Sequence, residues 1–326
     1  MSLDPAVAAV RLAVRRCLVE VGDQPVLVAC SGGADSLALL TATVFEARDR
    51  PWRVVGVTVD HDLQAGSSDR TQSVVGQMAT LGVDETVAVR VHVEASGQGP
   101  EAAAREARYS VLEEVAERFG SPVVLLGHTL DDQAETVLLG LTRGSGGRSI
   151  AGMRSAFDRF RRPLLEISRA QTEAACAAEG LSYWMDPHNA DPAFTRSRIR
   201  TEVMPVLERE LGPGVAQALA RTATQLQADV AALDAIAETT YADLASDREL
   251  PVARLEMLPD AIRLRVLRLA ALDAGAIPGD LTHGHLLAVD ALVRNWRGQR
   301  WVDLPGDLRA VRRDDRVTFA GSDRSA

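Results

Sequence analysis

The stretch from Val26 to Leu37 has the residue types and the order that a phosphate-binding turn needs. An apolar, β-favouring run ends in Ser-Gly-Gly, and a helical pattern rich in leucine follows at once. A strand, a glycine turn and a helix N-terminus direct backbone N–H groups and the positive end of a helix dipole at one point, which suits an anion. Ser31 and Ser36 can add hydroxyl donors. A carboxylate beside a phosphate needs a cation between them, so Asp35 indicates Mg²⁺.

Two better-known phosphate loops do not fit this stretch. The P-loop of nucleoside triphosphatases needs Gly-Lys-Ser/Thr, and this chain contains no lysine, so all 36 of its lysine-or-arginine residues are arginines. The dinucleotide fingerprint needs G-x-G-x-x-G, whereas the glycines here are adjacent. An ordinary strand-to-helix turn, with Asp35 or Ser36 as the N-cap, is the remaining alternative.

A second cluster, of His128, Asp132 and Glu135, follows another strand pattern. On a helix that begins near Leu130, Asp132 and Glu135 share a face. Such a pair suits a cationic amine or Mg²⁺, although the helix dipole alone also favours acids near a helix N-terminus. His128 is either a general base or a buried structural ring. Its place beside a phosphate turn and two acids favours the first interpretation.

Arginines form the third group of candidates. Arg105 and Arg108 are three residues apart and can clamp a phosphate, although spacing alone favours pairing with acids such as Glu101. From Arg143 to Arg200 there are ten arginines against six acidic residues, in a chain of net charge −9. This concentration behind a glycine-rich loop favours contact with a polyanion over an ordinary solvated surface.

Strands and helices alternate along the first two thirds of the chain. The patterns predict strands at residues 26–30, 52–60, 86–93 and 122–127, with helices at 5–21, 101–119, 130–141 and 199–210 and others that end near 48, 81 and 180. This alternation predicts an α/β fold with a doubly wound, mainly parallel, Rossmann-like sheet. Ligands of such sheets bind at the carboxyl ends of the strands. We therefore expect the phosphate turn, Asp60-His61 and His128 on one edge.

The pattern changes after Gly212-Pro213-Gly214. Helices are predicted at 215–244, 259–272 and 282–293, followed by short strands at 301–308 and 316–319. We therefore predict two domains, a catalytic one at 1–212 and a smaller, mainly helical one at 213–326 that ends in a hairpin.

Composition points to the cytoplasm. Cys17, Cys30 and Cys176 are odd in number, widely spaced and set in apolar surroundings, which is typical of buried thiols in a reducing compartment. The amphipathic residues 1–20 lack the apolar core of a signal peptide, and no run is long enough to span a bilayer. We expect a soluble, cytoplasmic protein with no membrane partner.

In combination these motifs resemble a known family. The run Ser31-Gly32-Gly33-Ala34-Asp35-Ser36 is similar to the PP-loop of ATP pyrophosphatases, which several enzymes share. Further stretches narrow the resemblance to the tRNA(Ile)-lysidine synthetases, over about residues 24–210: Gly99–Tyr109, Gly127–Thr136, Arg143–Gly146, Arg162–Leu165, Asp186–Asp191 and Arg196–Leu207.

The resemblance implies a ligase that forms a carbon–nitrogen bond on the wobble cytidine of the minor isoleucine tRNA, whose anticodon is CAU. ATP would first adenylate the base at its C2 oxygen, with release of pyrophosphate. The amine of free L-lysine would then displace AMP and give lysidine. The codon read would change from AUG to AUA, and the amino acid from Met to Ile.

Motif matching also implies roles for single residues. The phosphates of ATP and Mg²⁺ would be held by Ser31, Gly32, Gly33, Ala34, Asp35 and Ser36, with Asp35 at the metal. Arg108 and Arg200 would contact ATP or its leaving pyrophosphate, Asp132 and Glu135 would bind lysine, and His128 would lie near the reacting atoms. The implied contacts with tRNA are the second domain and Arg143, Arg148, Arg154, Arg161 and Arg162.

Two positions depart from the family pattern, namely Ser197 in place of Asn and Asp62 in place of Gly, and the chain has room for only one domain after the catalytic one. Among rivals, a tRNA thiolase would need a cysteine pair and an amidotransferase would need a glutaminase domain. A nucleotide-binding sensor without turnover is the alternative from another class. The sequence leaves the oligomeric state open, with a homodimer as one alternative.

Overall fold

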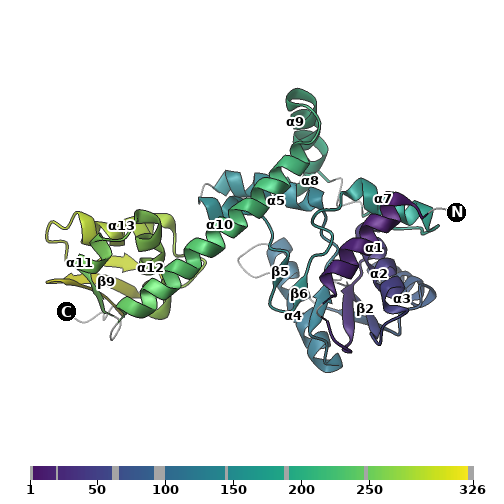
Figure 1. Ribbon diagram of the computed structural model, residues 1–326, viewed down its shortest axis with the longest axis horizontal. Coiled ribbons are helices and arrows are strands. Elements are labelled where there is room, and N and C mark those ends of the chain that lie inside the picture. Colours follow the sequence, from purple (N-terminus) through teal and green to yellow (C-terminus); the bar gives the residue numbers. More distant parts are fainter. Residues whose placement is uncertain are drawn as a thin grey trace. The chain divides into compact units, whose positions relative to one another are not determined.

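The computed structural model describes residues 3–19, 21–60, 66–91, 100–143, 146–186, 191–245 and 249–321, so that His61, Asp62 and Asn189 lie outside the described part. Contacts divide the chain into two compact units (Figure 1). The first comprises Met1–Thr142 and Gly152–Ala223, and the second comprises Arg143–Ala151 and Thr224–Ala326. The contacts thus divide within α10 (Val215–Leu244), whereas the predicted domain boundary lies just before this helix.

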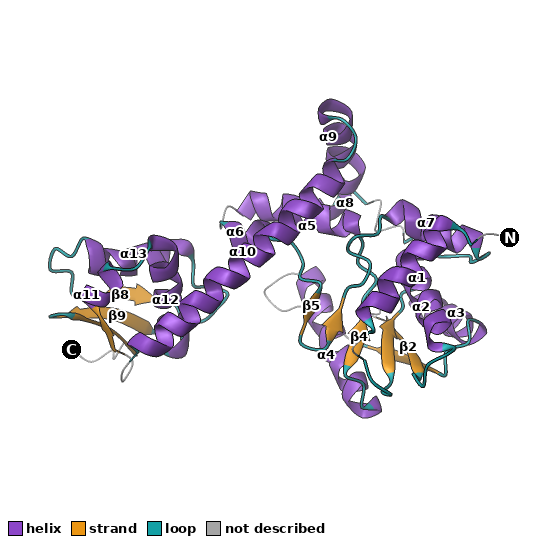
Figure 2. Cartoon of the chain, in the orientation of Figure 1, coloured by secondary structure: helices purple, strands orange, loops and turns teal. Residues whose placement is uncertain are grey.

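A six-stranded sheet forms the centre of the first unit (Figure 2). Its order is β3-β2-β1-β4-β6-β5, and every neighbouring pair is parallel except β5 and β6. The strands are β1 (Val26–Ala29), β2 (Val54–Asp60), β3 (Glu85–Arg90), β4 (Val123–Leu125), β5 (Ala156–Phe157) and β6 (Phe160–Arg161). The prediction of a mainly parallel α/β sheet is confirmed, and the β5–β6 hairpin is an addition to it.

Alternation along the strands covers both faces of this sheet. Val26, Val28 and Leu125 pack in one apolar cluster, whereas Leu27 and Val124 point to the other. The first cluster includes residues of α1 (Pro5–Cys17), α2 (Ala34–Ala47), α3 (Ser67–Thr80) and α7 (Arg169–Ala178). The second is closed by α4 (Pro100–Phe119). The sheet is therefore doubly wound, and its carboxyl edge is left for a site.

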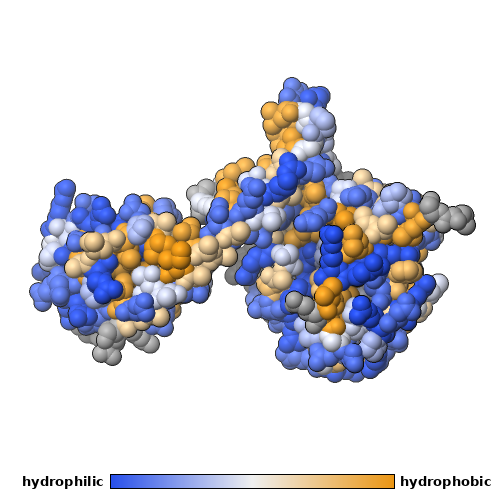
Figure 3. All heavy atoms as spheres, viewed as in Figure 1, coloured by the Kyte–Doolittle hydropathy of each residue, from blue (hydrophilic) through white to orange (hydrophobic). Residues whose placement is uncertain are grey.

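The helix predicted at 199–210 has an irregular start. It is preceded by α8 (Thr195–Arg198), opens with a π-helical turn at Ile199–Val203, and continues as α9 (Met204–Leu211). Such wide turns often occur at functional sites, and this one carries Arg200. None of the residues of α9 is buried, and Figure 3 shows hydrophobic atoms along one side of this helix.

Helices cover a four-stranded antiparallel sheet in the second unit. The sheet has the order β7-β10-β9-β8, with β7 (Glu249–Pro251), β8 (Val302–Leu304), β9 (Leu308–Arg313) and β10 (Arg316–Gly321). The helices are α6 (Gly147–Ile150), α11 (Val252–Glu256), α12 (Asp260–Asp273), α13 (His283–Arg294) and the second part of α10. The helices predicted at 215–244, 259–272 and 282–293 and the strands β8 and β10 are confirmed, whereas β7, α11 and most of β9 were not predicted. Within the described residues, no helix combines the length and the apolar character needed to cross a membrane.

The buried Arg263 offers a test of the second unit. It is 2% exposed, and it donates to Asp290 Oδ1 at 2.5 Å and to the carbonyl oxygen of Leu258 at 2.7 Å. We expect Arg263→Met to lower the free energy of unfolding by about 3 kcal/mol in urea titrations, because Asp290 would lose its cation. The exposed Arg254→Met is the control, with an expected change of about 0.5 kcal/mol or less. Equal losses in the two variants would contradict this account.

Candidate active site

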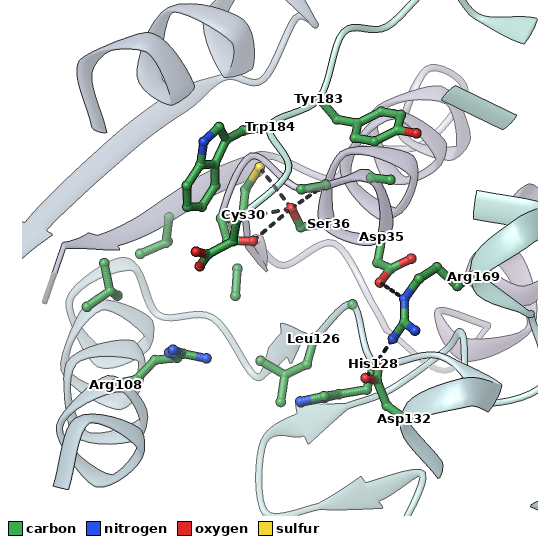
Figure 4. Close-up of a pocket in the computed structure, with 18 of the residues that line it drawn as sticks. Cys30, Asp35, Ser36, Arg108, Leu126, His128, Asp132, Arg169, Tyr183 and Trp184 are labelled. Atoms are coloured by element: carbon green, nitrogen blue, oxygen red, sulfur yellow. Dashed lines mark hydrogen bonds and ion pairs between the residues drawn. The ribbon is translucent and has the colours of Figure 1, made fainter. Parts of the chain in front are cut away.

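A cavity of about 570 Å³ opens at the carboxyl edge of the parallel sheet (Figure 4). Its walls come from the turn after β1, the β4–α5 junction, α4, α7 and the segment 183–186, where α5 is Leu130–Arg143. The cavity gathers residues that are distant in sequence, among them Asp35, Arg108, His128, Asp132 and Arg200. The expectation that the strand ends share one site therefore holds for these residues.

The turn after β1 has the geometry of an anion site. Gly32 has φ +83°, and a Cβ there would lie 2.6 Å from Val74 Cγ2, so that only glycine fits. The N-cap residue of α2 is Gly33, and no side chain makes a capping hydrogen bond there. This excludes the alternative in which Asp35 or Ser36 is the N-cap residue of the helix. Ser36 Oγ instead donates to the carbonyl oxygen of Gly33 at 2.9 Å and accepts from Ser31 N at 3.2 Å. The first N–H groups of α2 thus have no capping side chain.

The β4–α5 junction packs directly on this turn. A Cβ on Gly127 would lie 3.2 Å from backbone atoms of Asp35 and Ser36. This close approach places His128, the next residue, beside the phosphate turn. Both His128 and Asp132 line the cavity, and Figure 4 shows the ring of His128 between Leu126 and Asp132.

Arg169 links the acidic side chains of the site. Its Nη2 lies 3.0 Å from Asp132 Oδ1, its Nη1 3.6 Å from Glu135 Oε1 and its Nε 3.7 Å from Asp35 Oδ2. Sequence reasoning missed this residue. The signal that could have found it is its place at the first position of α7, where a helix dipole disfavours a cation unless acids lie nearby.

Glu135 is paired with a second arginine. Arg200 Nε donates to Glu135 Oε1 at 2.7 Å, and Arg200 Nη2 donates to Glu135 Oε2 at 3.0 Å. Arg196 Nε lies 3.7 Å from the same carboxylate. Glu135 is 1% exposed, while Arg200 lines the cavity. The acid pair expected to bind an amine is therefore already matched by guanidinium groups.

Burial sets the protonation of the site. The pKa of Asp35 is raised to about 6, mainly by burial and also by the negative charge of the nearby Asp132. The hydrogen bond from the Thr172 hydroxyl and the charge of Arg169 lower it in part. Burial also raises the pKa of Asp132, but the net shift is downward, because Arg169, the Thr129 backbone N–H and Arg200 all favour the ionised carboxylate. The pKa of His128 falls to about 3, mainly through burial. At neutral pH the site therefore holds ionised carboxylates and a neutral imidazole.

Arg162 lies inside the first unit. It is 6% exposed, and it donates from Nε to His128 Nδ1 at 3.1 Å, from Nη2 to Tyr109 Oη at 3.1 Å and from Nη1 to the carbonyl oxygen of Arg154 at 2.6 Å. Its donors are engaged within the protein, so we correct its assignment as a tRNA contact.

The other arginines expected at tRNA are spread over both units. Arg161 donates to the carbonyl oxygens of Asp158 and Phe160, and Arg154 lies over the Phe157 ring at 5.9 Å. Arg148, in the second unit, pairs with Asp234. The side chain of Arg143 lies outside the described part of the structure.

Family comparisons agree with this geometry. Residues 8–207 match the family model described as a PP-loop domain, and residues 250–318 match the model described as a TilS substrate binding domain. Among solved structures, the U34-tRNA thiolase NcsA from Methanococcus maripaludis is similar with a TM-score of 0.58 and 19% identity, over 68% of this chain and 79% of that one. At this identity the likeness concerns the fold alone.

Curated relatives are much closer in sequence. The tRNA(Ile)-lysidine synthase of Salinispora arenicola is 53% identical over 97% of this chain and 97% of its own length. That of Thermobifida fusca is 52% identical over 96% and 97%, and that of Streptomyces coelicolor 48% identical over 98% and 99%. Because these relatives match almost the whole chain, the chain belongs to the family of tRNA(Ile)-lysidine synthases.

Proposed function

We propose that the cavity at the carboxyl edge of the sheet is where this ATP-dependent ligase forms lysidine on tRNA(Ile). The observation that carries this proposal is the meeting of an uncapped phosphate turn, a neutral histidine and a cluster of acids and arginines in one cavity. The turn supplies backbone donors for the phosphates of ATP. Holding base, ATP and amine together makes each attack effectively unimolecular.

Asp35 fits the role proposed for it at Mg²⁺. Within the described residues no group of three or more His, Cys, Asp or Glu side chains could hold a metal by itself. Mg²⁺ commonly binds through one carboxylate together with substrate phosphates, and Asp35 lies beside the phosphate turn with a raised pKa that a cation would relieve. The ion would neutralise charge on the leaving pyrophosphate, and Arg108, which lines the cavity from α4, would do the same.

Lysine would bind at Asp132 and Glu135, and this requires a rearrangement. Both carboxylates accept from Arg200 and lie within 3.6 Å of a guanidinium nitrogen of Arg169. A lysine ammonium that enters must replace at least one of these contacts. Because Asp132 lines the cavity and Glu135 does not border it, Asp132 would meet the ligand first.

The tRNA would reach the cavity with its wobble cytidine turned out of the anticodon loop, as enzymes that modify a base require. We propose that Arg143, Arg148, Arg154 and Arg161, together with the second unit, contact the tRNA backbone. These assignments lie within one chain, so the proposal does not require a homodimer. We propose a cytoplasmic location for the protein, since its proposed substrate is a tRNA.

Lysine transfer tests the function directly. The chain is incubated with labelled L-lysine, Mg-ATP and an isoleucine tRNA transcript with a CAU anticodon, and AMP release is followed in the same tube. We expect label in this tRNA and none in methionine tRNA, with one AMP formed per lysine transferred. AMP without transfer would point to another nucleophile, and no AMP would favour a nucleotide sensor.

Asp132→Asn tests the lysine site. We expect the KM for lysine to rise about 10- to 100-fold, because one charge-assisted contact is lost, while the KM for ATP changes by less than about threefold. Asp131→Asn is the matched control, since Asp131 accepts from the backbone N–H of Arg169 at 2.7 Å and an amide oxygen can replace it. Equal effects on lysine and ATP would count against Asp132 as a lysine ligand.

Asp35→Asn tests both the metal role and the buried charge. The folded pKa of about 6 exceeds the ordinary 3.8, so the wild type gains stability as pH falls through this window, and above it the ionised group costs stability. We therefore expect the ligand-free variant to melt a few degrees higher than wild type near pH 8, with the difference shrinking towards about pH 4.5. Mg-ATP should stabilise only the wild type.

The control for this experiment is Asp229→Asn, an exposed position on α10. Asp229→Asn should change the melting temperature by a similarly small amount near pH 8 and at about pH 4.5. A variant at Asp35 that melts below the wild type at all pH values would refute the buried-charge account.

A further inference from the structure

His128 meets the Arg162 guanidinium through its Nδ1 atom. The donor is Nε of Arg162, and the distance is 3.1 Å. An arginine side chain carries five N–H groups, has no acceptor and is not deprotonated in proteins. The Nδ1 atom must therefore present its lone pair to Arg162. A neutral imidazole with an acceptor at Nδ1 carries its proton at Nε2.

Arg162 is itself held in place from several sides. Tyr109 Oη accepts from it at 3.1 Å, the carbonyl oxygen of Arg154 accepts at 2.6 Å, and the Phe157 ring lies 4.6 Å below the guanidinium. Tyr109 in turn packs edge-to-face on Phe160, with ring centroids 4.9 Å apart. With three donor directions used, the guanidinium has little freedom to turn away from His128.

We propose that Arg162 is a positioning residue that fixes His128 as the neutral tautomer protonated at Nε2, and that His128 serves the reaction as a hydrogen-bond donor and not as a base. The second half of this inference rests on the function proposed above for the cavity. His128 lines the cavity beside the phosphate turn, so the donor can meet an oxygen on which charge develops. A ring with Nε2 already protonated and Nδ1 occupied cannot take the proton of the attacking amine.

The charges around His128 agree with a ring that stays neutral. Asp132 on α5 favours the charged form, whereas Arg162 after β6, Arg105 on α4 and Arg196 on α8 oppose it, and burial opposes it most. A neutral imidazole is a weaker acid than an imidazolium, so it donates without losing its proton. Its protonation should not change over the pH range in which the enzyme works.

Nuclear magnetic resonance of the ligand-free full chain tests the tautomer without any assumption about function. Histidine is labelled with ¹⁵N, and the His128 signals are those that His128→Asn removes. We expect one protonated and one unprotonated ring nitrogen, in the pattern of the Nε2-protonated tautomer, unchanged from about pH 5.5 to about pH 8. An Nδ1-protonated ring, or an imidazolium within this range, would overturn the proposal.

Variants then test the part played by Arg162. In Arg162→Met the two tautomers should become mixed, because Nδ1 would lose the donor that now occupies it. Arg162→Lys, which keeps one charged donor, should restore the single tautomer at least in part. Arg159→Met, a neighbouring arginine that pairs with Glu117, should leave the His128 signals unchanged. A wild-type tautomer pattern in Arg162→Met would refute the positioning role.

Lysine transfer by two His128 variants separates a donor from a base. The amide nitrogen of Gln can occupy the place of Nε2 and donate, but it cannot accept a proton. We expect His128→Gln to keep the rate within about tenfold of wild type and His128→Ala to lose about 100-fold or more. Equal loss in both would refute the donor role. If the wild type shows the expected tautomer but transfers no lysine, the proposed function fails and the positioning by Arg162 stands.

Discussion

The arrangement of the site depends on the guanidinium of Arg169, which lies between carboxylates from two helices. Asp35 comes from α2, and Asp132 and Glu135 come from α5. Without a cation between them, the ionised carboxylates would repel one another, and their burial would cost them hydration. Because Arg169 opens α7, which packs with α2 in the same apolar core, this ion-pair cluster connects the phosphate turn to the acids expected to hold lysine.

Two arginines favour opposite charge states in two residues of one cavity, although burial contributes most to the neutral state of His128. Arg169 favours the ionised form of Asp132, whereas Arg162 favours the uncharged form of His128. The difference follows from their partners, since a guanidinium stabilises a negative neighbour and disfavours a second positive one. The site can therefore offer a fixed anion and a neutral N–H donor side by side at the same pH. In the reaction proposed above, the ammonium group of lysine would use the anion and an oxygen of the activated base or of ATP would use the donor.

Local sequence patterns account for much of this structure, and long-range contacts account for the rest. The phosphate turn, the parallel strands and the pair Asp132 and Glu135 were predictable because each is encoded within a few neighbouring residues. Arg169 and Arg162 contact partners that lie 37 and 34 residues away in the sequence. At such separations the spacing of residues does not predict which side chains meet. The two-residue strands β5 and β6 could not be predicted either, because they are defined by their pairing with each other and with β4 and not by their composition.

The absence of lysine from this chain gains a meaning once the site is known. In the reaction proposed above, the adenylated cytidine would be an electrophile that a nearby primary amine could attack. A guanidinium stays protonated and delocalised, so Arg169 and Arg200 can pair with Asp132 and Glu135 without acting as nucleophiles. A lysine side chain in either place would be a tethered rival of the free amino acid, at an effective concentration that the free amino acid could not match. If the proposed reaction is right, the all-arginine composition means that no lysine side chain of this chain could couple to the activated base.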